Sequence, residues 1–89
     1  MVARRVVVSG QVQGVGFRMA CAREAARLAV GGWVRNRSDG AVELHAEGRP
    51  QDVERLVAWA RHGPRHAQVE GVEVTDAESQ ELRGFDITG

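Results

Sequence analysis

The pattern of hydrophobic and polar residues divides the chain into short alternating elements. An apolar run at residues 6–8 predicts the centre of a first strand over residues 3–9. From Phe17 to about Val30, apolar residues recur at the spacing of an amphipathic helix. The glycine pair at residues 31–32 is expected to end this helix.

The middle of the chain predicts a β-hairpin. Residues 32–37 form a short strand pattern, and the Ser-Asp-Gly run at residues 38–40 is a turn signal. The following strand alternates cleanly, so that one face is apolar and the other polar. The apolar face holds Val42, Leu44 and Ala46, and the polar face, expected to be exposed, holds Glu43, His45 and Glu47.

The second half predicts one more helix and two strands. Pro50 fits the first helical turn, although Arg49 before it is a poor N-cap, and the glycine-proline pair at residues 63–64 is expected to end the helix. A strand follows over residues 67–75, where the apolar phase shifts and predicts a bulge near residues 70–71. Phe85 and Ile87 indicate a last short strand.

This order of elements predicts an α+β fold of the ferredoxin-like, split βαβ class, with an extra C-terminal strand, in one domain over residues 1–89. Both helices should cover one face of the sheet. The first two strands should run parallel, with the third antiparallel between them. The loop after the first strand and the end of the second strand then lie at the same edge, which brings Arg18 and Asn36 together.

Composition limits the classes of function. Twelve basic and twelve acidic residues cancel, so the net charge favours binding neither to nucleic acid nor to a membrane surface. No apolar run approaches the length of a membrane span or of a signal-peptide core. The single cysteine, Cys21, excludes an intramolecular disulfide and fits a reducing cytoplasm. We expect a small cytoplasmic monomer.

Residues 10–18, with sequence GQVQGVGFR, carry the candidate chemistry. Glycines at positions 10, 14 and 16 allow a loop whose N–H groups closely approach a ligand. The helix that follows presents unpaired N–H groups and a positive dipole end, which favour an anion such as phosphate. Arg18 adds a guanidinium suited to phosphate oxygens. We interpret this stretch as an oxyanion cradle.

Asn36 is the candidate for orienting a water molecule beside that cradle. Its amide both donates and accepts hydrogen bonds, so it could hold a water molecule in line with a leaving group. Neither an acid nor a metal-ligand cluster accompanies the loop, which points to substrates with a good leaving group. A carboxylate leaving an acyl phosphate meets this condition, whereas the alkoxide of a phosphate ester does not.

Two long motifs resemble the signatures of the acylphosphatase family. The first is residues 10–18, and the second is GWVRN at residues 32–36, followed by Gly40, Val42 and Gly48. The resemblance covers nearly the whole chain and implies a ferredoxin-like hydrolase that needs no metal or cofactor. Its products would be a carboxylate and inorganic phosphate. By resemblance Arg18 binds phosphate and Asn36 orients water, while the backbone phosphate ligands come from Gln13, Gly14, Val15, Gly16, Phe17 and Arg18.

Structural alternatives exist for each candidate residue. The glycine loop could be only a tight turn, Arg18 a surface ion pair with a nearby glutamate, and Asn36 a strand-end or turn residue that bonds its own backbone. Cys21 and Arg27 have the Cys-x5-Arg spacing of cysteine phosphatases, but the helical residues between them cannot readily wrap a phosphate. The three histidines lie in different elements, so surface positions are expected for them rather than a zinc site.

Two other functions remain open at this point. One is a module that binds phosphate or carboxyl phosphate without turnover, as acylphosphatase-like domains occur inside larger maturation enzymes. The other is an interaction domain with a structural loop. RNA binding is disfavoured because the third strand offers acids instead of aromatic and basic side chains. We expect the domain to stand alone, which favours the enzyme, and the site to be open and permissive for the acyl group.

Overall fold

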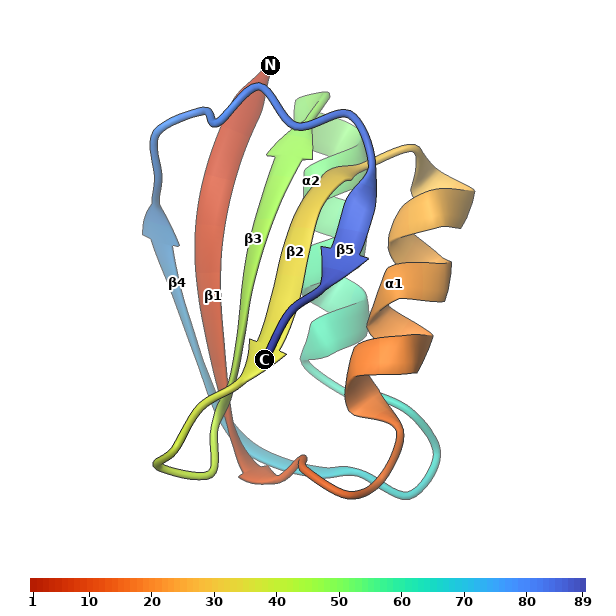
Figure 1. Cartoon of the computed structure of the whole chain (residues 1–89), viewed down its shortest axis with the longest axis vertical. Helices are drawn as coiled ribbons and strands as arrows, with labels where there is room; N and C mark the ends of the chain where they lie inside the picture. The colour runs from red at the N-terminus through yellow and green to blue at the C-terminus, as the bar shows by residue number, and fades with distance from the viewer.

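The computed structural model describes all residues, 1–89, and shows the predicted order of elements (Figure 1). The elements are β1 (Val2–Gln11), α1 (Phe17–Leu28), β2 (Gly31–Asn36), β3 (Val42–Gly48), α2 (Pro50–Ala60), β4 (Gln68–Asp76) and β5 (Phe85–Ile87). Neither helix has the length and apolar character needed to cross a membrane.

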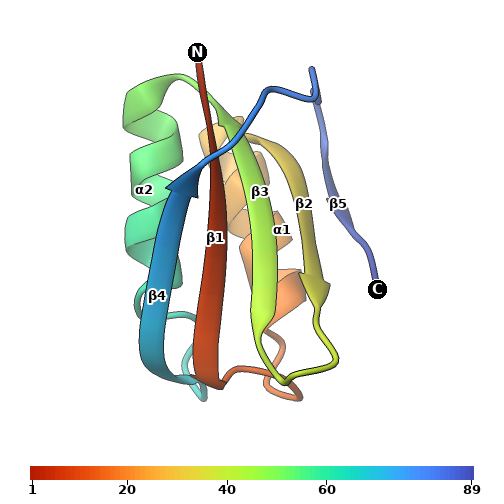
Figure 2. The same cartoon turned by 90° about the vertical axis from the view of Figure 1, so that its left-hand side faces the viewer.

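The sheet has the strand order β4-β1-β3-β2-β5. Strand β3 lies between β1 and β2 and is antiparallel to both, while β5 pairs with β2 in parallel. Both helices pack against the same face of the sheet (Figures 1 and 2). The predicted ferredoxin-like arrangement is therefore confirmed, including the parallel direction of β1 and β2.

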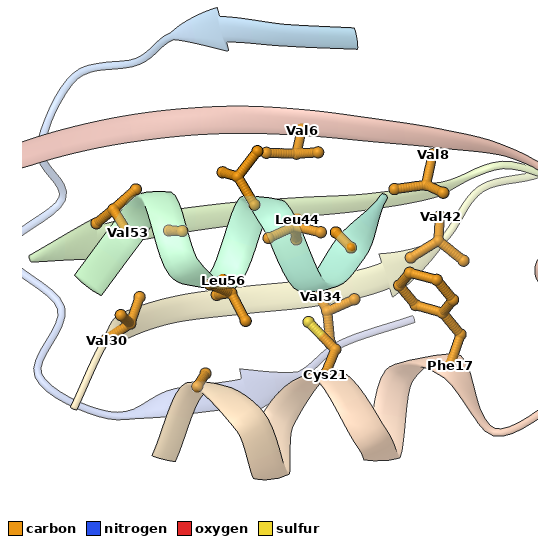
Figure 3. Packing of buried hydrophobic residues seen from close by; sticks show 14 of the residues in the cluster. Val6, Val8, Phe17, Cys21, Val30, Val34, Val42, Leu44, Val53 and Leu56 are labelled. Carbon is orange, nitrogen blue, oxygen red and sulfur yellow. The ribbon is translucent and has the colours of Figure 1, made fainter. Parts of the chain in front are cut away.

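One hydrophobic core fills the space between the helices and the sheet (Figure 3). Strands contribute Val6, Val8 and Leu44, and the helices contribute Phe17 and Leu56, all of them fully buried. Each such side chain stabilises the fold by roughly 1.5–3 kcal/mol relative to an exposed position. Since Phe17 begins α1, the same packing fixes where the loop before it ends.

Helix α1 ends at Leu28, earlier than predicted, because Ala29 takes the left-handed conformation at φ 57°. The N–H of Val30 then bonds the carbonyl oxygen of Ala25 at 2.9 Å, as in a Schellman motif. The glycines at residues 31–32 belong to β2 instead of ending the helix. A Cβ on Gly32 would lie 1.7 Å from the carbonyl oxygen of His45, so this position requires close approach of the two strands.

The other boundaries differ from the predictions by a few residues. Helix α2 ends at Ala60, before the expected glycine-proline stop, and Arg49 makes no side-chain cap, as predicted. The bulge in β4 is confirmed, because β1 residue Ser9 pairs with Gly71 while the next residue pairs with Val69. Glu70 is therefore the extra residue.

The polar face of β3 is buried, contrary to the prediction that it is exposed. Glu43, His45 and Glu47 are only 4%, 2% and 7% exposed. Glu43 is covered by ion pairs with Arg5 and with Arg35, the latter at 2.7 Å. The alternation of β3 distinguished two faces correctly, but charged neighbours cover the polar one in place of water. His45 is consequently not a surface histidine.

A segment that joins β4 to β5 crosses this polar face (Figure 2). Glu47 accepts hydrogen bonds from the N–H groups of Gln80 at 2.8 Å and Leu82 at 2.7 Å, and from His45 Nε2 at 2.6 Å. Burial opposes ionisation of Glu47, but these hydrogen bonds outweigh it and lower its pKa to about 2. Trp33 stacks on the His45 ring at 6.0 Å between centroids.

Candidate active site

The loop between β1 and α1 is anchored at both ends and open between them. Val12 and Phe17 are buried, whereas Gln13, Gly14 and Gly16 are exposed. Gly14 and Gly16 have φ values of 76° and 78°, in the left-handed region. Nothing lies within 4 Å of a Cβ built on either glycine, so the space beside the loop is open. Glycine is required at these two positions by the positive φ and not by a lack of room.

The N–H groups of residues 13–19 make no hydrogen bond within the protein. The N-cap of α1 is Gly16, which has no side chain to accept from them, and the first turn contains no acidic residue. Unpaired N–H groups and an uncompensated helix dipole together attract an anion. The loop and the first turn of α1 therefore have the chemistry of an anion site.

Arg18 lies in that first turn, half-buried, and forms no ion pair. The alternative of a surface ion pair with a glutamate is therefore wrong. Glu24 on the same helix pairs with Arg27 instead. The guanidinium of Arg18 is unpaired and belongs to the same helical turn as the unpaired N–H groups, so it is available to an anion bound there.

Asn36 ends β2 and pairs with Val42 on β3. Directly opposed residues share a face of the sheet, so the Asn36 side chain lies on the face covered by the helices. Its Oδ1 atom is buried and has no hydrogen-bond partner. Asn36 is a strand-end residue, but its side chain makes no hydrogen bond to the backbone; in the hairpin turn it is Asp39 that accepts the N–H of Ala41, at 3.1 Å. That hydrogen bond is the main cause that lowers the pKa of Asp39.

The fold brings the loop and the end of β2 to the same end of the molecule, as predicted (Figure 1). Phe17 and Val42, the cross-strand partner of Asn36, belong to the same buried core (Figure 3). The Gln13 side chain connects the β1–α1 loop to the turn between β2 and β3, since its Nε2 donates to the carbonyl oxygens of Arg37 at 2.8 Å and Ala41 at 3.0 Å. Sequence reasoning assigned only the backbone of Gln13 and missed this contact.

The candidate site is a surface without an enclosing pocket. Residues 13–18 line none of the four surface grooves of the molecule. A polar groove of about 430 Å³ lies over the β2–β3 hairpin, with a lining that includes Asn36, Arg37 and Asp39. An apolar groove of about 350 Å³ lies elsewhere, between α2 and the β1–β4 edge. A bound phosphate would therefore leave its substituent largely in solvent.

The other reactive side chains are one buried thiol and two exposed histidines. Cys21 points into the core (Figure 3), and burial raises the pKa of its thiol to about 12, with Glu24 adding to the shift. Such a thiol remains protonated and does not act as a nucleophile. His62 and His66 are exposed, as predicted. No group of three or more His, Cys, Asp or Glu side chains is arranged to hold a metal ion.

Comparisons with known proteins agree with this geometry. A family model described as acylphosphatase matches residues 4–87. An acylphosphatase from Nocardioides sp. is 52% identical over 82 residues, which are 92% of this chain and 83% of the relative. The crystal structure of acylphosphatase from Bacillus subtilis has a TM-score of 0.95 and 37% identity, with all of both chains covered. HypF of T. kodakarensis has a TM-score of 0.87 and 31% identity, with all of this chain but 12% of HypF covered.

Proposed function

The chain belongs to the acylphosphatase family, and from this premise we propose that it hydrolyses the carboxyl–phosphate bond of an acyl phosphate. Water supplies an oxygen to phosphorus, the acyl oxygen leaves as a carboxylate, and the phosphate is released as inorganic phosphate. The chain's own contribution lies in binding, orientation and electrostatics, so it forms no covalent intermediate.

The phosphate binds across the loop and the first turn of α1. The N–H groups of residues 13–18 donate to its oxygens, and the Arg18 guanidinium neutralises part of its charge. This assignment rests on the row of N–H groups without internal partners and on an arginine without an ion pair. Oriented donors of this kind stabilise charge on a transferring phosphoryl group more strongly than water does.

Asn36 orients the attacking water. The observation that supports this role most directly is its buried Oδ1, which has no partner in the protein. A buried acceptor without a partner costs about 1–3 kcal/mol, so a bound water that donates to it is favoured. That water keeps its lone pair free for the phosphorus atom. The amide serves as a positioning group because it is too weak a base to remove a proton.

The carboxylate leaving group explains why the proposed reaction needs few catalytic side chains. A carboxylate is stable when it departs and requires no proton from a general acid. The open site also places no enclosing wall around the acyl part of the substrate. We therefore propose that the enzyme acts on acyl phosphates as a class and selects weakly among their acyl groups.

Hydrolysis of benzoyl phosphate tests the assignment. Arg18→Ala is expected to lower kcat and to weaken inhibition by inorganic phosphate, whereas Asn36→Ala is expected to lower kcat with phosphate inhibition retained. Arg23→Ala is the matched control, because Arg23 is an exposed arginine on the same helix without an ion pair. Unchanged kcat in the Asn36 variant would refute the role in orienting water.

A phosphate-binding module without turnover is the second candidate. The similarity to a region that makes up 12% of HypF favours it, because a domain of this shape also occurs within a larger protein. The same assay separates the two functions. Phosphate binding by the wild-type protein without hydrolysis of benzoyl phosphate would support the module and exclude the enzyme.

We also propose that the protein acts as a cytoplasmic monomer on small molecules and binds neither nucleic acid nor membranes. Equal numbers of basic and acidic residues support this proposal, as does the single cysteine buried as a protonated thiol. On the open sheet face the guanidinium groups of Arg5 and Arg35 are paired with Glu43, which offsets their charge toward a nucleic acid. Sedimentation at several protein concentrations tests the monomer.

A further inference from the structure

We propose that the side chain of Gln13 is a positioning residue that sets the distance between the phosphate loop and Asn36. The inference rests on the proposed function, since it assigns a role within the same site. It concerns the side chain only, whereas the backbone of Gln13 is already assigned to the phosphate. The side chain is exposed, yet it makes two hydrogen bonds to main-chain atoms of a different element.

The two bonds use the full donor capacity of the amide. Nε2 carries two hydrogens, and it donates to the carbonyl oxygens of Arg37 at 2.8 Å and Ala41 at 3.0 Å. These carbonyl groups belong to the residue directly after β2 and the residue directly before β3, at the start and end of the hairpin turn. The N–H of Arg37 also bonds the carbonyl oxygen of Ala41 at 2.8 Å, which closes the hairpin at the same level.

The attachment point is directly beside Asn36. Arg37 follows Asn36 in the chain, and Ala41 precedes Val42, the cross-strand partner of Asn36. The side chain of Gln13 is therefore hydrogen-bonded to the backbone next to both members of the Asn36–Val42 pair. On its own side, Gln13 lies between the anchored Val12 and the loop's two left-handed glycines. One residue thus links the part that holds phosphate to the part that holds water.

Such a link affects catalysis more than binding. Phosphate affinity depends on the N–H groups and Arg18, which stay in place when the Gln13 amide is removed. The attack of water depends on the spacing between phosphorus and the water at Asn36. A misplacement of about 1 Å lowers a rate by roughly 100-fold. Loss of the link is therefore expected to lower kcat while the inhibition constant for phosphate changes little.

The test uses benzoyl phosphate with Gln13→Ala and Gln13→Glu. The second variant keeps the shape of glutamine but presents carboxylate oxygens to the two carbonyl oxygens. We expect both to lower kcat by about tenfold or more. In Gln13→Ala the inhibition constant for inorganic phosphate should change by less than about threefold, whereas the carboxylate added in Gln13→Glu should also weaken phosphate inhibition by repulsion. Gln11→Ala is the matched control, because Gln11 is an exposed glutamine at the end of β1 whose side chain makes no hydrogen bond. Unchanged kcat in both Gln13 variants would overturn the proposal.

A double-mutant cycle shows whether Gln13 acts through Asn36. In the Asn36→Ala background, Gln13→Ala should lower kcat no further, since no positioned water remains to be lost. The same fold reduction in both backgrounds would overturn the proposal and leave the role of Asn36 intact. Unchanged kcat in Asn36→Ala alone would instead refute the proposed function.

A second control separates positioning from hairpin stability. Asp39→Ala removes the hydrogen bond to the Ala41 N–H and the ion pair with Arg37, so it loosens the same turn without touching the loop. We expect this variant to keep kcat within about threefold of wild type. A loss as large as that of Gln13→Ala would overturn the proposal, because turn stability would then explain both effects.

Discussion

The imidazole of His45 lies 2.6 Å from the carboxylate of Glu47 on the face of the sheet opposite the helices. The pair is buried beneath the segment that crosses from β4 to β5, and two N–H groups of this segment complete the bonding of Glu47. Glu47, near the end of the central strand β3, therefore holds the connection between β4 and β5 in place by hydrogen bonds. This connection contains no helix or strand.

This arrangement predicts a specific loss of stability in acid. The pKa of Glu47 is lowered to about 2, so its contribution is fully present above its ordinary value of 4.5 and is lost as the pH falls toward 2. The free energy of unfolding from Glu47 alone should fall by about 2 kcal/mol between pH 7 and pH 3. Urea unfolding at both pH values, for wild type and Glu47→Gln, measures it. The same pH dependence in both proteins would contradict the assignment.

Alanine at Gly14 or Gly16 should damage the loop through conformation alone. Both residues have φ near 77°, where a side chain costs about 1–2 kcal/mol, and neither has a neighbour that a Cβ would touch. We expect each variant to unfold more readily and to bind inorganic phosphate more weakly. Gly84→Ala is the control, because that glycine also has open space but an ordinary φ. Phosphate inhibition at wild-type strength would exclude the loop as the anion site.

Alanine at Gly32 should be far more damaging than alanine in the loop. Its Cβ would lie 1.7 Å from the carbonyl oxygen of His45, and the φ of 149° is also unfavourable for a side chain. The strands β2 and β3 would have to separate where they pair. We expect a loss of more than about 3 kcal/mol in the free energy of unfolding, or no folded protein. A folded Gly32→Ala variant of wild-type stability would show that this backbone relaxes easily.

The thiol of Cys21 should be dispensable for catalysis. Burial raises its pKa to about 12, so iodoacetamide is expected to leave the native enzyme active and to modify it only after unfolding. Cys21→Ala should keep kcat and lose on the order of 1 kcal/mol of stability from the core. Rapid inactivation by iodoacetamide in the folded state would indicate a cysteine-based mechanism instead.

The sequence is sufficient to predict the order of elements, the bulge near Glu70, and the position of the β1–α1 loop and the end of β2 at the same end of the molecule. These features follow from the periodicity of apolar residues, which the residue types show, and from the topology that the order of elements implies. The prediction that Gly31 and Gly32 end the first helix is wrong, because both lie in β2. Glycine is typical both of helix ends and of strands that approach closely, so the residue type alone does not distinguish them. Here a left-handed Ala29 ends the helix, a conformation that alanine seldom adopts.

The polar side of β3 and the role of the Gln13 side chain needed the structure. Alternation predicts two faces, but it does not reveal that Arg5 and Arg35 cover Glu43 from neighbouring strands. The contact of the Gln13 side chain also cannot be predicted from residue types. Its partners are main-chain carbonyl oxygens, which every residue has.

Strand β5 has a consequence for self-association. Its parallel pairing with β2, extended by the bond from the Asn36 N–H to the Gly89 oxygen at 3.3 Å, occupies the edge that β2 would otherwise present to other molecules. The opposite edge, β4, carries the bulge and the acidic residues Glu70, Glu73 and Asp76, which discourage strand addition. A chain that loses residues 77–89 would therefore expose a template for intermolecular β-pairing beside Asn36, so that damage at this end would promote aggregation and block the site together.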